Sequence, residues 1–167
     1  INMGHQQKSE EAKVGDKEKK GGKYDTKMRI TTISWIPFKA LPDMYRVIER
    51  SMKQVNGNHF GYEGMMITEQ AQFTEYPKGG FYDWHMDAEA NCRFEPPVRK
   101  ISMTILLSPP HEFEGGDLEF MAEGNKPPQL LQGQAIFFCS LIRHRVNKVK
   151  KGIRRSLVMW FGGPPFK

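Results

Sequence analysis

The sequence predicts a mainly β domain, built as a sandwich or barrel of short strands and supported by one or two N-terminal helices. Beyond about residue 65 the chain alternates between short runs rich in β-branched and aromatic residues and turns rich in Gly and Pro. One earlier stretch instead carries apolar residues at helical spacing. With 167 residues, 38% of them hydrophobic, the chain suits a single globular domain with one core.

Residues 1 to 27 are rich in Lys, Glu, Gln and Gly and nearly free of large apolar side chains. Such a segment cannot offset the entropy lost on ordering, so we expect a flexible Lys-rich tail. The folded domain is therefore expected to span residues 28–167.

The domain should open with a strand over residues 28–36, whose β-branched residues and Trp35 favour extended structure. A helix is expected from Pro42 to about Val55. Its apolar residues recur at helical spacing, Pro42 suits a first helical turn, and the pair at 56–57, Asn-Gly, should end it.

The remaining strands share a high content of Val, Ile, Phe, Tyr and Trp and are bounded by turn residues. We expect them at 66–76, 80–86, 99–107, 117–121, 134–139, 144–149 and 153–161. The intervening turns fall at 77–79, 108–110, 114–116, 126–128 and 150–152.

Composition narrows the class of protein. No apolar run is long enough for a membrane helix, and the N-terminus lacks the apolar stretch of a secretory signal, so we expect a cytoplasmic, intracellular protein. Cys92 and Cys139 show no CxxC spacing, and free thiols are expected rather than a disulfide or zinc knuckle. A net charge of +6 permits nucleic acid as a partner but does not favour it.

The pattern of His85 and Asp87 is the sharpest chemical feature of the sequence. In an extended strand these two side chains share a face, so both can bind one divalent ion. One more His would complete the set of two His and one carboxylate that is typical of Fe(II) oxygenases. The pattern alone also permits a buried structural His85 and an Asp87 that merely ends the strand.

Three histidines compete for the third ligand position. His144 is favoured because it opens a strand after the apolar run at 135–138 and can lie at a barrel mouth. His111 lies in an exposed Pro-rich turn, and His59 lies in a polar stretch before the barrel begins.

Several ordered segments resemble the Fe(II) and 2-oxoglutarate-dependent dioxygenases, in the prolyl 4-hydroxylase-like branch that includes PKHD-type hydroxylases. The resemblance runs from about 67 to 162, and its matching segments are 76–87, 113–118, 133–138, 144–146 and Arg154. It implies a double-stranded β-helix, a cupin-like jelly roll, with His85, Asp87 and His144 as metal ligands. The implied cofactors are Fe(II), 2-oxoglutarate and O₂, with ascorbate as a further candidate.

The far carboxylate of 2-oxoglutarate needs an anchor, and a guanidinium can bind it through two parallel hydrogen bonds. By the resemblance this anchor is Arg154, with Arg155 as the rival, because only Arg154 reproduces the RxS pattern with Ser156. Trp160 resembles a pocket-wall tryptophan of the branch. Tyr76 could donate a hydrogen bond to 2-oxoglutarate, although a packing role is equally compatible with the sequence.

Many animal and plant prolyl hydroxylases carry Lys where Arg154 stands, so the pattern is closer to the bacterial PKHD type. The favoured function is C–H hydroxylation with release of succinate and CO₂, most readily on a prolyl residue of a peptide or on a free amino acid. Oxidative demethylation of nucleic-acid bases is the alternative, and a jelly-roll binding module without metal is a third hypothesis.

The compact chain resembles bacterial or viral enzymes. The loops at 88–98 and 121–128 are expected to be mobile lids that choose the substrate.

Overall fold

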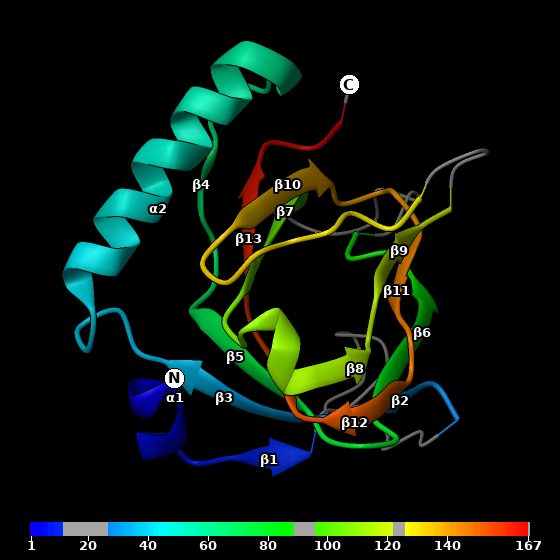
Figure 1. Cartoon of the computed structure of the whole chain (residues 1–167). Coiled ribbons are helices and arrows are strands. Elements are labelled where there is room, and N and C mark those ends of the chain that lie inside the picture. Colours follow the sequence, from blue (N-terminus) through cyan, green and yellow to red (C-terminus); the bar gives the residue numbers. More distant parts are fainter. Residues whose placement is uncertain (12–26, 89–95, 122–125, 167) are drawn as a thin grey trace.

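The computed structural model describes residues 1–11, 27–88, 96–121 and 126–166, and it shows two antiparallel sheets that face each other as a jelly roll (Figure 1). The larger sheet has the order β1-β3-β5-β13-β7-β10, with β4 also paired to β13. The smaller sheet has the order β2-β6-β11-β9, and β12 pairs with β8 alone. The predicted fold class is confirmed.

The strands of the larger sheet include the longest in the described chain, and each pairing in this sheet is antiparallel. The strands are β1 (Glu10–Glu11), β3 (Thr32–Ile36), β4 (Met66–Ile67), β5 (Ala71–Tyr76), β7 (Val98–Leu106), β10 (Ala135–Cys139) and β13 (Arg154–Gly163).

The smaller sheet and a separate two-stranded sheet consist of shorter strands. The smaller sheet contains β2 (Arg29–Ile30), β6 (Phe81–His85), β9 (Leu118–Phe120) and β11 (His144–Val146). The two-stranded sheet pairs β8 (Phe113–Gly115) with β12 (Val149–Gly152), and a 3-10 turn over Pro110–Glu112 precedes β8.

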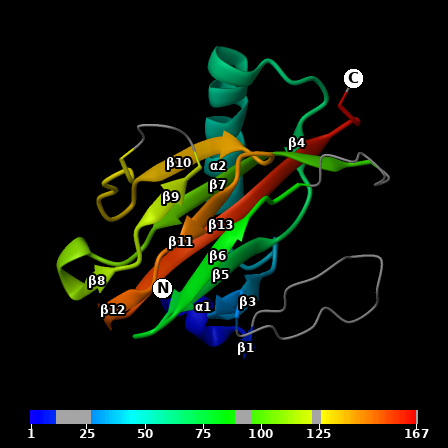
Figure 2. The same ribbon diagram turned by 90° about the vertical axis from the view of Figure 1, so that its right-hand side faces the viewer.

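Helix α2 (Pro42–Val55) has the predicted bounds and lies along the outer face of the larger sheet (Figure 2). It buries Tyr45, Ile48 and Met52 against residues of β3, β5, β7 and β13 to form the main core. The helical conformation does not end at residues 56–57 as predicted. It continues as a π-helical turn over Asn56–Phe60, and this turn is capped by Gly61, whose φ of 70° is left-handed.

A second, smaller core lies between the two sheets. It joins Tyr76 of the larger sheet to Leu118 and Val146 of the smaller one, with Val149 beside them. Tyr76, Leu118 and Val146 of this core also line a pocket, together with residues of β6 and β11.

The N-terminal segment differs from the expected flexible tail in the part that the structure describes. Residues Asn2–Gln6 form the short helix α1, and β1 follows it along the edge of β3 (Figure 1). Gly4 is buried so closely against the Phe73 ring that a Cβ would overlap it, and His5 Nε2 lies 2.9 Å from Glu75 Oε1. The expectation of a flexible tail rested on the average composition of residues 1–27, which does not reveal such local contacts. Residues 12–26 of the expected tail lie outside the described residues.

Further differences concern strand boundaries. Three predicted strands are each divided in two: 28–36 into β2 and β3, 66–76 into β4 and β5, and 144–149 into β11 and the start of β12. The predicted turns at 114–116 and 150–152 instead contribute to the β8–β12 pair. In the described part of the chain, no helix combines the length and the apolar character that crossing a membrane requires.

Candidate metal centre

The meeting point of β6 and β11 brings two histidines together. His85 ends β6, His144 begins β11, and the two residues are direct partners in the antiparallel pairing. Immediately after β6 the chain turns inward, because the backbone N–H groups of Asp87 and Ala88 both donate to the carbonyl of Ser140, at 3.0 and 3.1 Å. This turn carries the Asp87 carboxylate between the two imidazoles.

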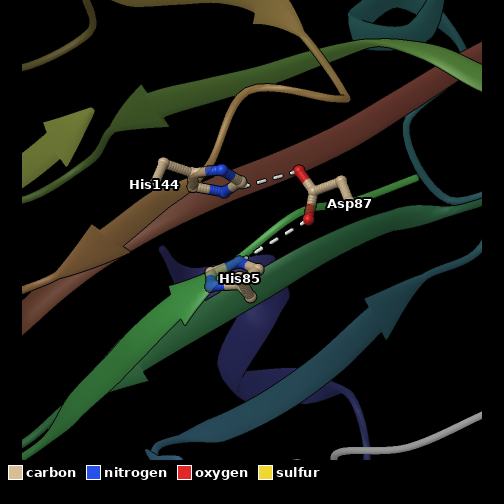
Figure 3. A group of neighbouring side chains, drawn as sticks. All are labelled: His85, Asp87 and His144. Atoms are coloured by element: carbon tan, nitrogen blue, oxygen red, sulfur yellow. Dashed lines mark ion pairs between the residues drawn. The ribbon is translucent and has the colours of Figure 1, made fainter. Parts of the chain in front are cut away.

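The three side chains converge on one small volume (Figure 3). His85 Nε2 lies 3.6 Å from Asp87 Oδ1, and His144 Nε2 lies 3.6 Å from Asp87 Oδ2. All three ligand atoms lie within 4.8 Å of one another, and none of the three side chains is more than 12% exposed. Each carboxylate oxygen therefore faces a different imidazole nitrogen.

Backbone carbonyls determine the tautomer of both rings. His85 Nδ1 lies 2.7 Å from the carbonyl oxygen of Asp83, and His144 Nδ1 lies 3.0 Å from that of Ile142. Because a carbonyl only accepts hydrogen bonds, Nδ1 must carry the proton in each ring. The Nε2 lone pairs then point toward Asp87, and such a second contact also orients a ligating histidine.

The electrostatics of the group favour a neutral His85 and an ionised Asp87. Burial, together with the nearby His144, lowers the pKa of His85 to about 4. Burial alone would raise the pKa of Asp87, but His144, His85 and a hydrogen bond from Ser102 outweigh it, and the pKa is lowered. At neutral pH the group is a neutral imidazole beside an ionised carboxylate, which is the state that binds metal.

This donor set fits Fe(II). Two imidazole nitrogens and one carboxylate on the same side of an ion leave the other positions open, as in non-haem iron oxygenases. The rival histidines lie outside the group: His59 is exposed in the π-helical turn, and His111 is exposed in the 3-10 turn.

Arg154 lies in the same pocket, a cavity of about 740 Å³ between the sheets. It is only 3% exposed, its Cζ lies 5.7 Å from the centre of the Tyr76 ring, and burial lowers the pKa of its guanidinium. No carboxylate pairs with it among the described residues. The Asp117 carboxylate partly offsets the effect of burial on this pKa, but it forms no ion pair with Arg154. A buried guanidinium without a direct carboxylate partner suits the binding of an anionic ligand.

The other predicted binding residues also line this pocket, and they differ in how their polar groups are hydrogen-bonded. The Ser156 hydroxyl is already engaged, because it accepts from Arg154 Nη1 at 3.2 Å and lies 2.6 Å from Thr74 Oγ1. Tyr76 is 3% exposed and belongs to the core between the sheets. Trp160 is 6% exposed, and its buried Nε1 has no hydrogen-bond partner among the residues that the structure describes.

Several residues of the pocket were not identified from the sequence. Ser102 donates to Asp87 Oδ2 at 2.7 Å, and Arg99 stacks over Trp160 at 3.8 Å and pairs with Glu69. Arg29 lines the pocket from β2. No local signal marked Ser102 in the sequence, because the same strand also carries Arg99, Lys100 and Thr104.

A model of the 2OG-Fe(II) oxygenase superfamily matches residues 71–162, which is more than half of the chain. A PKHD-type hydroxylase of Idiomarina loihiensis is 37% identical over 86 residues, which cover 51% of this chain and 38% of that protein. Another, from a Synechococcus strain, is 30% identical over 122 residues, which cover 71% of this chain and 52% of the relative. The chain thus spans about half, or less, of these relatives.

The structure of a Pseudomonas putida prolyl-4-hydroxylase superposes with a TM-score of 0.64 at 26% identity, and the match covers 84% of this chain and 76% of that one. A viral collagen prolyl hydroxylase from Paramecium Bursaria Chlorella virus-1, in its 2OG complex, shares the fold with a TM-score of 0.69 at 19% identity; coverage is 82% and 81%. The matched residues 71–162 include the three converging side chains and Arg154. The chain belongs to the 2OG-Fe(II) oxygenase superfamily, and the relatives and solved structures to which it is similar are PKHD-type and prolyl hydroxylases.

Proposed function

We propose that this protein is an Fe(II)- and 2-oxoglutarate-dependent hydroxylase that adds a hydroxyl group to a C–H bond of proline, either free or within a peptide. The observation that carries the proposal is the convergence of His85, Asp87 and His144 in the pocket that also holds the buried Arg154. The names of the PKHD-type relatives and of the bacterial prolyl-4-hydroxylase support the choice of reaction and substrate.

In this proposal His85, Asp87 and His144 hold one side of the ion. The bound Fe(II) supplies the activation of O₂, coupled to conversion of 2-oxoglutarate into succinate and CO₂. Arg154 binds the far carboxylate of 2-oxoglutarate through its guanidinium fork, and Ser156 holds that guanidinium in place. The pocket walls at Leu118 and Val146 limit the access of water.

The direct test is a mass-spectrometric screen of amino acids and proline-containing peptides for a product with one added oxygen atom. The product should form only when both Fe(II) and 2-oxoglutarate are present. A methylated oligonucleotide belongs in the same screen, because its demethylation without any hydroxylated peptide or amino acid would replace proline with nucleic acid as the substrate class.

A substitution of Asp87 tests the assignment of the metal ligands. Asp87→Ala should reduce Fe(II)-dependent succinate formation by at least 1000-fold, because the ion loses its charged ligand. Asp43→Ala is the matched control, since Asp43 is an exposed residue at the start of α2 and pairs only with Arg46. Full turnover by the Asp87 variant would remove the metal assignment.

A further inference from the structure

The positive charges in the pocket are not equally neutralised. Three arginines line it: Arg29, Arg99 and Arg154. Arg99 is paired through both sides of its fork, with Nε 2.5 Å and Nη2 2.6 Å from the two carboxylate oxygens of Glu69. Arg154 is the position proposed above for 2-oxoglutarate. Arg29 remains, and among the described residues it has no ion pair.

Arg29 is held in place by neutral groups only. It lies on β2, opposite Tyr82 of β6, and its Cζ lies 4.4 Å from the centre of the Tyr82 ring. Nη2 donates to Gln72 Oε1 at 3.2 Å, while Nε is buried and has no hydrogen-bond partner in the part of the chain that the structure describes. A buried N–H without an acceptor costs free energy, which a bound acceptor would recover.

The buried polar atoms that lack a hydrogen-bond partner also indicate what kind of ligand the pocket binds. Among the described residues there are two such side-chain atoms, Arg29 Nε and Trp160 Nε1. Both are donors, and both residues line the pocket that holds the metal group. No buried acceptor is left unsatisfied in this part of the chain. The pocket is therefore complementary to a ligand that is rich in acceptor oxygens.

Arg29 is close to the metal group and separate from the Arg154 anchor. The Tyr82 ring that it contacts is stacked on the His85 ring, with centres 3.5 Å apart. Arg154 instead contacts Tyr76. Gln72 and Tyr76, the β5 residues that serve the two arginines, are four positions apart on one strand, on the order of 13 Å. The two guanidiniums can thus serve different carboxylates.

We propose that Arg29 binds a free carboxylate of the substrate, so that the protein acts on a free amino acid or a C-terminal residue rather than on an internal residue of a peptide. This inference rests on the proposed function and narrows its substrate class. The planar guanidinium matches a carboxylate and would use the unsatisfied Nε as one of its two donors. An internal peptide residue offers only neutral amides at this position.

The test measures binding without turnover. The protein is loaded with Mn(II) and 2-oxoglutarate under nitrogen and titrated with L-proline, the dipeptide Gly-Pro and their C-terminal amides, followed by tryptophan fluorescence and calorimetry. Each free acid should bind at least tenfold more tightly than its amide. In Arg29→Gln this preference should disappear, while the affinity for 2-oxoglutarate changes by less than threefold.

Two further variants separate the role of the carboxylate from folding. Arg29→Lys keeps the charge but loses the fork, and it should retain an intermediate preference. Arg46→Gln makes the same substitution at an exposed arginine of α2 and should behave as the parent protein. Equal binding of acids and amides, equal weakening of both by Arg29→Gln, or binding of no free acid in the series would overturn the inference.

The outcome is distinct from that of the hydroxylase test. Hydroxylation of internal prolines without any preference for free acids would support the proposed function and contradict this inference. Selection of free acids through Arg29 without formation of succinate would support the carboxylate site and contradict the proposed reaction.

Discussion

The Asp87 side chain is restrained at both its carboxylate and its backbone. Ser102 donates to Oδ2 at 2.7 Å and lies 2.9 Å from the Ser140 hydroxyl, while the Ser140 carbonyl accepts the backbone N–H of Asp87. The carboxylate is thus placed before any ion arrives. Such outer contacts are known to raise metal affinity, because they remove alternative orientations of the ligand.

Removing the Ser102 hydroxyl should therefore weaken metal binding while the fold is kept. We expect Ser102→Ala to lower the affinity for Mn(II) by about 10- to 100-fold and the free energy of unfolding by about 1 kcal/mol. Calorimetric titration with Mn(II) and urea denaturation measure the two effects. Ser51→Ala is the control, since Ser51 only donates to the Val47 carbonyl on α2. Unchanged Mn(II) affinity in the Ser102 variant would show that Asp87 needs no such support.

Individual residues were predictable to different degrees. The spacing of His85 and Asp87 predicted a shared face, and the structure places both side chains beside His144. Their role as ligands stays a prediction. Ser102 could not be chosen from the sequence, because its contact with Ser140, 38 residues away, exists only once β7 and β10 are paired.

At the scale of elements, the turn between β8 and β9 shapes the Arg154 site. Gly116 has a φ of +69°, and a Cβ built there would lie 2.9 Å from Arg154 Cδ and 3.0 Å from Val149 Cγ2. Arg154 could not keep its position beside such a methyl group. Gly116→Ala should therefore weaken 2-oxoglutarate binding by more than tenfold and leave Mn(II) binding nearly unchanged, as measured by calorimetry.

Gly133→Ala separates this contact from backbone strain. Gly133 also has a positive φ, +83°, but a Cβ there meets no atom within 4 Å. Both variants should lose about 1–2 kcal/mol of stability from the left-handed backbone. Only Gly116→Ala should lose affinity for 2-oxoglutarate, and equal affinities in the two variants would contradict the proposed role of the turn.

One carboxylate adds a polar contact between the N-terminal segment and β5, beside the packing of Gly4 on Phe73 and the pairing of β1 with β3. Glu75 Oε1 accepts from Arg155 Nε at 2.8 Å and lies 2.9 Å from His5 Nε2. Burial alone would raise the pKa of Glu75, but these contacts lower it below its usual 4.5. The folded state therefore binds fewer protons. The stabilisation is complete above pH 4.5 and is lost as the pH falls through the lower pKa of the folded state.

Acid should thus release residues 1–11 from the sheet. We expect faster hydrogen exchange in this segment at pH 3.5 than at pH 7 after correction for intrinsic rates, with a smaller difference in Glu75→Gln. This variant should also lose about 1–3 kcal/mol at pH 7, because Arg155 loses its partner. Glu49→Gln, at an exposed residue of α2 that pairs with Lys53, is the control. The same pH dependence in the Glu75 variant and the parent would refute this attachment.

Elements with a strong local pattern were predicted well, and those that depend on distant partners were not. Helix α2 has its expected bounds because its periodic apolar face and Pro42 are local signals. The segments of β8 and β12 were predicted as turns, because each contains a glycine, a residue typical of turns. Gly115 and Gly152 do have positive φ in the structure. Only their pairing partners, Val149 and Phe113, turn these segments into strands.

For the whole molecule, strand periodicity predicted a sandwich or barrel, while the assignment of strands to sheets came only with the structure. The central strand β13 pairs with β5 and β7, which lie about 80 and 50 residues earlier in the chain. No local pattern encodes such a choice of partner, which depends on the total burial that it achieves. The resemblance to the jelly-roll family supplied this information indirectly.

Ligands that bind between the sheets should stabilise the entire fold. His85 and His144 belong to the smaller sheet and Arg154 to the larger one, so Mn(II) and 2-oxoglutarate together would join both. At 100 times its dissociation constant each ligand should add about 2.7 kcal/mol to the free energy of unfolding, which thermal and urea denaturation can measure. Asp87→Ala should lose the Mn(II) increment. Arg154→Gln should keep that increment and lose the one from 2-oxoglutarate, because its metal ligands are intact. Arg46→Gln should keep both, and loss of both increments in Arg154→Gln would mean that Arg154 maintains the metal group instead of binding the co-substrate.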